Sequence, residues 1–226
     1  MSSSRGQLFV VSAPSGAGKS TLLTALMARH STLRFSVSYT SRAPRAGDSE
    51  GVTYHFLSRE RFDAMVAAEE FLEYADVFGH GYGTRAADTD ALLDGGHDVL
   101  LDIDVQGMRQ VRSRARQPVT TIFILPPSRD TLEARLRGRG TDADDAIARR
   151  LATATAEMAA VPEYDYVVLN DQVSGAVEQL ASIVTAARAS RAAMRQASVD
   201  VARTFGVALE PAAWDRARAL HERGWR

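Results

Sequence analysis

Short apolar runs alternate along the chain with longer segments that have helical periodicity. Runs of strand length occur at residues 8–13, 35–39, 98–104, 119–125 and 166–170. After the first run, residues 19–30 place Leu22, Leu23 and Leu26 on one side of a helix. The apolar runs are continuous rather than alternating, which is typical of parallel strands that are covered on both faces. The pattern therefore predicts an α/β fold in which helices flank a parallel sheet.

Two segments do not follow this alternation. Residues 39–90 are polar, rich in glycine, tyrosine and arginine, and contain one helical segment at about 59–73. Residues 127–163 have helical periodicity but carry many arginines. We therefore expect a core with two insertions and a separate tail. The core comprises residues 6–38, 91–126 and 164–192, the insertions are 39–90 and 127–163, and the tail is 193–226.

Composition limits the classes of protein to consider. The net charge of −1 argues against a general nucleic-acid or membrane-surface binder, and the absence of cysteine excludes disulfides and thiolate metal sites. No apolar run is long enough to span a bilayer, and the first residues lack the apolar centre of a signal peptide. The five histidines are scattered without metal-ligand spacing. We expect a soluble cytoplasmic protein with no nucleic-acid or membrane partner.

The segment after the first apolar run carries the clearest chemical signal. It reads APSGAGKST and matches the phosphate-loop pattern G-x-x-x-x-G-K-[ST], except that Ala13 stands at the first glycine. Glycines let successive backbone N–H groups point at phosphate oxygens, and the start of the following helix adds positive potential. Lys19 reaches the β- and γ-phosphates, while the Ser20 hydroxyl is placed to bind Mg²⁺. The predicted ATP-binding residues are Ala13, Pro14, Ser15, Gly16, Ala17, Gly18, Lys19, Ser20 and Thr21.

Lys19 is the only lysine among 27 basic residues. A compact ammonium on a thin stem fits a phosphate loop, whereas the wide planar fork of arginine does not. A single lysine also excludes a Ras-type GTPase, which reads guanine with N-K-x-D, and a protein kinase, which needs a lysine on a separate strand. An ATP-using kinase or an ATPase remains. Asp102, at the end of a predicted central strand, would then hold Mg²⁺ through a water molecule.

Further segments resemble the guanylate kinase family, whose members phosphorylate GMP with ATP. They read FSVSYTSRAPRAGDSEGVTYHF, FLEYADVFGHGYGT, LLDIDVQG and RLRGRGTD, and the resemblance runs from about Leu8 to about Arg188. It implies a phosphate-loop kinase core, a GMP-binding insert at residues 39–90 and a helical lid at 127–163. The chain departs from the family pattern N-Y-Y-G, because it has His80-Gly81-Tyr82-Gly83 at that place.

Arginines and tyrosines of the insert form a candidate clamp for a monophosphate. Arg42 and Arg45 lie three residues apart in a loop, and Tyr54 and Tyr82 belong to the same polar segment. Two guanidinium forks and two phenol hydroxyls suit a phosphate group. The resemblance implies this role for all four residues.

The resemblance also assigns guanine recognition to Glu73. A carboxylate can accept hydrogen bonds from N1–H and the 2-amino group of guanine together, and adenine offers no such pair. Ser38, Thr84 and Asp104 complete the implied base pocket. Taken alone, Glu73 is a glutamate at the end of the predicted helical segment, and Asp104 is a second acid at a strand end.

Arginines of the second insertion are the candidate catalytic cations. Phosphoryl transfer builds negative charge on the migrating group and requires little covalent chemistry from the protein. A mobile lid of arginines would supply positive charge and exclude water. The resemblance places Arg135, Arg139 and Arg150 around the ATP phosphates with Lys19, and it places Asn170 near the adenine. No general base is obvious.

The predicted reaction transfers the γ-phosphate of ATP to GMP, with Mg²⁺ as cofactor. We expect dGMP to be accepted too, because no residue clearly reads the 2′-hydroxyl. Two alternatives stay open: a kinase of another small acceptor, and a catalytically inactive guanylate-kinase-like module that binds protein. In the tail, Trp214 and Trp225 indicate packing against the core or against a second subunit, so a homo-oligomer stays open. A partly ordered tail is the alternative.

Overall fold

The computed structural model describes residues 5–77, 79–138 and 144–189. The chain divides into two compact units, Met1–Ala187 and Arg188–Arg226, and the fold and site belong to the first. The predicted tail at 193–226 and Arg139 of the second insertion lie outside the described residues.

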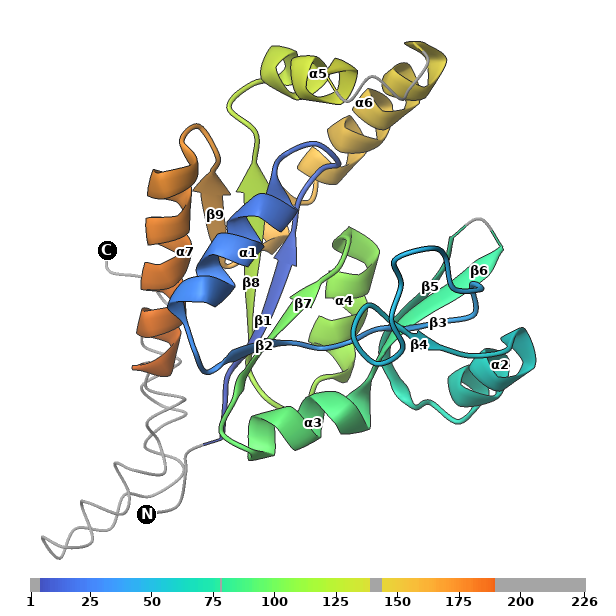
Figure 1. The fold of residues 1–226 in the computed structure, drawn as a ribbon. Helices are drawn as coiled ribbons and strands as arrows, with labels where there is room; N and C mark the ends of the chain where they lie inside the picture. The colour runs from blue at the N-terminus through green and yellow to red at the C-terminus, as the bar shows by residue number, and fades with distance from the viewer. Residues whose placement is uncertain (1–4, 78, 139–143, 190–226) are drawn as a thin grey trace, which may run out of the picture. The chain divides into compact units, whose positions relative to one another are not determined.

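A five-stranded parallel sheet forms the centre of the first unit (Figure 1). Its strand order is β2 (Leu33–Phe35), β7 (Asp98–Asp102), β1 (Leu8–Ser12), β8 (Val119–Leu125) and β9 (Tyr166–Leu169). The middle strand β1 is buried at all five residues, which explains why its sequence is apolar without alternation. The predicted α/β fold with a parallel sheet is confirmed.

Helices cover both faces of this sheet. They are α1 (Lys19–Arg29), α3 (Ala86–Asp94), α4 (Val105–Arg114) and α7 (Val173–Arg188). α1 and α7 pack on one face against Phe9 and Val11 of β1, whereas α3 and α4 pack on the other face against Leu8 and Val10. Because side chains alternate along a strand, β1 contributes to both hydrophobic clusters.

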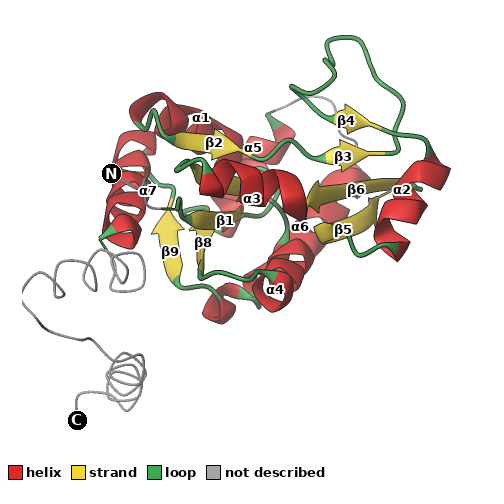
Figure 2. Cartoon of the chain, turned by 90° about the horizontal axis from the view of Figure 1, so that it is seen from below, coloured by secondary structure: helices red, strands yellow, loops and turns green. Residues whose placement is uncertain are grey.

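A second sheet, of mixed strand direction, lies to one side of the first (Figure 2). Its order is β4 (His55–Phe56), β3 (Tyr39–Thr40), β6 (His80–Arg85) and β5 (Phe71–Val77). The helix α2 (Arg59–Ala67) packs Phe62 and Met65 against Phe71 of β5. On its other side, β5 contacts α4, which connects the second sheet to the core.

The helical segment expected at 59–73 is wrong beyond Ala67. The chain turns at Glu69, which adopts the left-handed conformation (φ 54°), and the next residues pair with β6 as strand β5. Glu73 therefore lies in a strand rather than at a helix end. The pairing of β5 with β6 places Thr84 opposite Glu73.

The single strand expected at 35–39 is also wrong. β2 ends at Phe35 in the parallel sheet, while β3 begins at Tyr39 in the second sheet. The residues between them form neither helix nor strand. This apolar run marks the place where the chain crosses from one sheet to the other.

The second insertion forms a pair of amphipathic helices, α5 (Arg129–Arg137) and α6 (Asp144–Met158). Their apolar faces meet in a small cluster of Leu132, Leu136, Ile147, Leu151 and Ala154. The pair lies beyond the carboxyl ends of the central strands, near the loop that follows β1 (Figure 1). No helix in the described ranges is both long enough and apolar enough to cross a membrane.

Candidate active site

The phosphate loop joins β1 to α1, as the sequence predicts. Gly16 and Gly18 both have positive φ, 92° and 91°, a region that L side chains rarely enter. A Cβ atom at Gly18 would also lie 2.5 Å from Nδ2 of Asn170. The loop therefore needs glycine at position 18 for two reasons, backbone conformation and space.

Lys19 and Asp102 meet beside this loop. The Lys19 ammonium forms an ion pair with the carboxylate of Asp102, the last residue of β7. Ser20 and Thr21 are exposed in the first turn of α1. The described residues contain no group of three or more potential metal ligands from His, Cys, Asp and Glu. Oxygen donors from Asp102 and Ser20 nevertheless suit Mg²⁺, which takes one or two protein ligands and completes its shell with phosphate oxygens and water.

Asn170 and Arg135 hold the loop from the other side. Nδ2 of the buried Asn170, just after β9, donates to the carbonyl oxygen of Ala17 at 2.7 Å. Arg135 on α5 donates to the same carbonyl and to that of Asn170, each at 3.3 Å. Oδ1 of Asn170 is buried and has no hydrogen-bond partner in the described chain. Arg150 lies half-buried on α6.

Three of the four clamp residues come together in the second sheet and its loops. The buried Arg42 guanidinium lies 5.5 Å from the ring centroid of Tyr54, and the Tyr54 and Tyr82 rings are 5.8 Å apart. Arg42 is held by an ion pair with Asp48 at 2.9 Å. Arg45 differs, because its side chain is exposed.

Asp48 organises this clamp and was not predicted from the sequence. One of its oxygens accepts from the backbone N–H of Arg45 at 2.8 Å and from the Arg42 guanidinium. These two donors hold the pKa of the Asp48 carboxyl below its usual value, so it stays ionised. The only sequence signal is an acid three residues after Arg45.

Glu73 and Thr84 face each other across β5 and β6. The Thr84 hydroxyl donates to Oε1 of Glu73 at 2.6 Å, and both side chains are buried. Burial raises the pKa of Glu73 to about 6, against the opposing effect of the Thr84 hydrogen bond. The negative charge of Asp104 raises this pKa further, whereas the positive charge of Arg114 lowers it.

The other predicted members of the base pocket lie at its edges. Asp104 is exposed and caps α4, accepting from the backbone N–H of Gly107 at 2.8 Å. Its negative charge raises the pKa of Glu73. Ser38 is half-buried between the two sheets, and its carbonyl oxygen accepts from His55 N–H.

Two supporting residues escaped sequence reasoning. The Gln110 side chain on α4 binds both the N–H and the carbonyl of Tyr74, which follows Glu73 in β5. Glu157, near the end of α6, lies within electrostatic reach of Asp104 and Lys19, and burial is the main cause that raises its pKa. Both act across distant parts of the chain, so no local pattern reveals them.

The glycine that departs from the family pattern has a structural reason. A Cβ atom at Gly81 would lie 2.4–2.7 Å from three ring carbons of Phe62. Phe62 projects from α2 into this space and is almost fully buried. The Phe62 ring of α2 therefore occupies the space beside position 81 in this chain.

The fold and the site together define a phosphate-loop kinase of the nucleoside monophosphate class. The core holds a phosphate loop with its lysine and acidic partner, the second sheet holds a buried carboxylate and an arginine–tyrosine cluster, and α5 brings an arginine to the loop.

Comparisons with known proteins identify the family. The guanylate kinase family model matches residues 5–187. Guanylate kinases from Neisseria meningitidis serogroup A and Xanthomonas oryzae pv. oryzae are 52% and 48% identical, over 83% and 85% of this chain and 91% and 94% of theirs. The crystal structure of guanylate kinase from Anaplasma phagocytophilum matches with a TM-score of 0.66 and 32% identity, over 84% of this chain and 90% of that one. The chain belongs to the guanylate kinase family.

Proposed function

We propose that this site transfers the γ-phosphate of ATP to GMP, giving ADP and GDP, and that it also accepts dGMP. The observation that carries the proposal is the buried Glu73–Thr84 pair in the same small sheet as the Arg42–Tyr54–Tyr82 cluster. A buried carboxylate accepts both donors on the guanine edge, while the cluster binds the monophosphate. We also propose a cytoplasmic location, where ATP and GMP are both available.

On the ATP side, the loop from Ala13 to Thr21 holds the phosphates. Lys19 would exchange its ion pair with Asp102 for the β- and γ-phosphates when ATP binds, and the Asp102 carboxylate and the Ser20 hydroxyl are the groups that would hold Mg²⁺, Asp102 through water. The bound metal ion supplies positive charge to the migrating phosphoryl group. Oδ1 of Asn170 is buried and unpaired within the described residues, and it is the acceptor that we assign to the adenine amino group.

Transfer itself requires positioning more than covalent chemistry. An oxygen of the GMP phosphate attacks the γ-phosphorus, the bond to the ADP oxygen breaks, and ADP leaves. Arg135 already contacts the phosphate loop, so its guanidinium needs only a small movement to reach the transferring group. Arg139, Arg150 and Arg45 are the further cations that we expect around the phosphates, while Ser38 and Asp104 border the base.

The test is the formation of ADP from ATP and Mg²⁺ with a panel of acceptors: GMP, dGMP, AMP, UMP, dTMP and none. We expect rapid turnover with GMP and dGMP over a low blank, and none with Lys19→Ala, whose circular dichroism should match that of the unmodified protein. Equal turnover with AMP would indicate a kinase of another acceptor. ATP binding without turnover of any acceptor would instead favour the protein-binding module, which the comparisons do not favour.

A further inference from the structure

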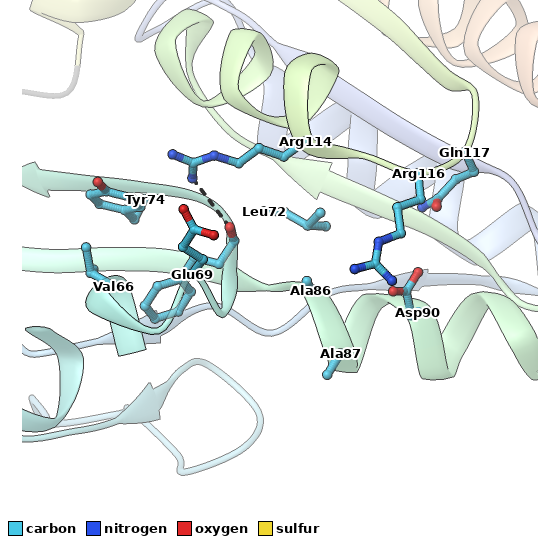
Figure 3. A pocket seen from close by; sticks show the side chains of 11 residues that line it. Val66, Glu69, Leu72, Tyr74, Ala86, Ala87, Asp90, Arg114, Arg116 and Gln117 are labelled. Atoms are coloured by element: carbon cyan, nitrogen blue, oxygen red, sulfur yellow. Dashed lines mark hydrogen bonds between the residues drawn. The ribbon is translucent and has the colours of Figure 1, made fainter. Parts of the chain in front are cut away.

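A cavity of about 520 Å³ lies behind β5, away from the nucleotide site (Figure 3). Its walls are the end of α2, the strand β5, the start of α3 and the segment that follows α4. None of the residues assigned to ATP or GMP lines it. Its volume is within the range of small-molecule sites. We call it the β5 cavity.

The β5 cavity combines an apolar floor with two guanidinium groups. Leu72 lies on the floor, with Arg114 and Arg116 to either side of it (Figure 3). Arg116 has no ion pair or hydrogen bond within the described residues. Asp90, one of the two lining carboxylates, pairs with Arg5. Glu69 and Asp90 balance the two arginines in formal charge, and the guanidinium of Arg116 is the group open to an anion.

Arg114 lines this cavity, and its charge also acts on Glu73 in β5. Its guanidinium lies 5.3 Å from the Tyr74 ring centroid and donates to the carbonyl of Phe71 at 3.4 Å. Leu72 and Tyr74 flank Glu73 in β5 and line the cavity, whereas the Glu73 carboxylate lies against the start of α4, where a Cβ atom at Gly107 would be 3.1 Å from Oε2.

The positive charge of Arg114 favours the ionised form of Glu73. Burial opposes that form most strongly, and Asp104 at the start of α4 opposes it too, whereas the Thr84 hydroxyl and Arg114 support it. Arg114 is the only cation among these influences. Its neutralisation would therefore shift Glu73 toward the protonated acid, which no longer offers guanine two acceptor oxygens.

We propose that the β5 cavity is an effector site for a small organic anion with an apolar body, and that its occupant weakens GMP binding by neutralising Arg114. The negative group, a phosphate or a carboxylate, binds Arg114 and Arg116. The apolar body covers Leu72. The coupling rests on the proposed role of Glu73 in binding guanine, whereas occupancy of the cavity does not.

Occupancy is tested by calorimetric titration of the full chain, saturated with Mg²⁺ and ADP, with phenyl phosphate, benzoate and inorganic phosphate. The first two probes distinguish a phosphate from a carboxylate head, and the third lacks an apolar body. We expect an organic anion to bind, and Arg116→Gln to weaken it about tenfold, the worth of one charge-assisted hydrogen bond. Arg42→Gln, which damages the monophosphate clamp, should leave this affinity unchanged.

The opposite pattern would overturn the site. If Arg42→Gln weakens probe binding and Arg116→Gln does not, the probe binds in the GMP clamp. If no probe binds, the cavity has no ligand of this class. Neither result depends on kinase activity, so failure of the proposed reaction would be recognised separately.

Coupling is tested by the dissociation constant of GMP with and without the bound probe. We expect the probe to weaken GMP binding several-fold in the unmodified protein and in Arg114→Lys. In Arg114→Gln, GMP should bind more weakly from the outset and the probe should have no further effect. An equal effect of the probe in all three proteins would overturn the coupling through Arg114.

Discussion

Glu73 is 7% exposed in β5, and burial raises the pKa of its carboxyl from an ordinary 4.5 to about 6. The folded chain therefore binds this proton more tightly than the unfolded chain. Its favourable contribution to folding is complete below pH 4.5 and is lost as the pH rises through 6. At neutral pH the buried carboxylate destabilises the ligand-free protein by about 2 kcal/mol.

Glu73→Gln should consequently stabilise the ligand-free protein at pH 7.5 by about 1–2 kcal/mol, because it removes a buried charge and keeps an acceptor for Thr84. The gain should vanish at pH 4.5. Urea unfolding at the two pH values measures it, and the same variant should lose affinity for GMP far more than for ATP.

The exposed Glu178, which pairs with Arg29, provides the control for this substitution. Glu178→Gln should change the free energy of unfolding by less than about 0.5 kcal/mol at either pH. A loss of stability in Glu73→Gln at pH 7.5 would mean that the carboxylate is better solvated than its burial implies.

Arg135 and Arg129 lie on the same helix with different surroundings. Arg135 contacts the phosphate loop, whereas Arg129 is exposed at the start of α5. We expect Arg135→Gln to lower kcat by about 10²–10³-fold, because one positive charge is lost from the transition state. Arg129→Gln should stay near the unmodified rate. Equal kcat values in steady-state assays of the two variants would remove Arg135 from the reaction.

The packing of α2 against β6 determines whether a side chain larger than hydrogen is tolerated at position 81. Gly81 on β6 lies under the Phe62 ring of α2, so a methyl group there forces the helix and strand apart. Gly81→Ala should lower the free energy of unfolding by about 1–3 kcal/mol. Adding Phe62→Leu should recover part of that loss, because it frees space for the new methyl group.

Gly175 in α7 is the matched control, because a Cβ atom there meets nothing within 4 Å. Gly175→Ala should raise stability by about 0.5–1 kcal/mol through helix propensity. Thermal unfolding of the variants measures both signs. A neutral Gly81→Ala would show that α2 moves freely over the second sheet.

Sequence patterns predicted an element correctly where one apolar run forms one buried strand. The run at 119–125 coincides with β8, and the run at 98–104 ends early only because Asp104 caps the next helix. The pattern failed at 35–39, where two sheets share one apolar run. It also failed at β5, whose polar residues resemble a helix continuation.

The same division applies to the site. Lys19, Gly18 and Asp102 belong to local patterns, and the structure brings them together. Asp48 and Gln110 act on residues that other segments supply, so their roles follow only from the folded chain. The residues of the base pocket and the phosphate clamp were assigned by resemblance to the family, because residue spacing alone did not assign them.

At the scale of the molecule, the hydrophobic clusters of the described residues lie within the first compact unit. The cluster between the central sheet and α7 includes Ala187, and the family model ends at residue 187. A chain that stops after residue 189 should therefore unfold within about 3 °C of the full protein and keep its kcat. Calorimetry and the ADP assay test this, and a large loss of either quantity would assign the remaining residues a structural role.

Lys19, which pairs with Asp102, is the only lysine in the 226 residues, and this has a practical consequence. Reagents that acylate amines meet a single side-chain target besides the amino terminus, and that target lies in the phosphate loop. Coupling of a dye, a bead or a cross-linker to the Lys19 amine would therefore inactivate the protein. The acylation rate of Lys19 would also report occupancy of the nucleotide site, because a bound nucleotide protects the amine from the reagent.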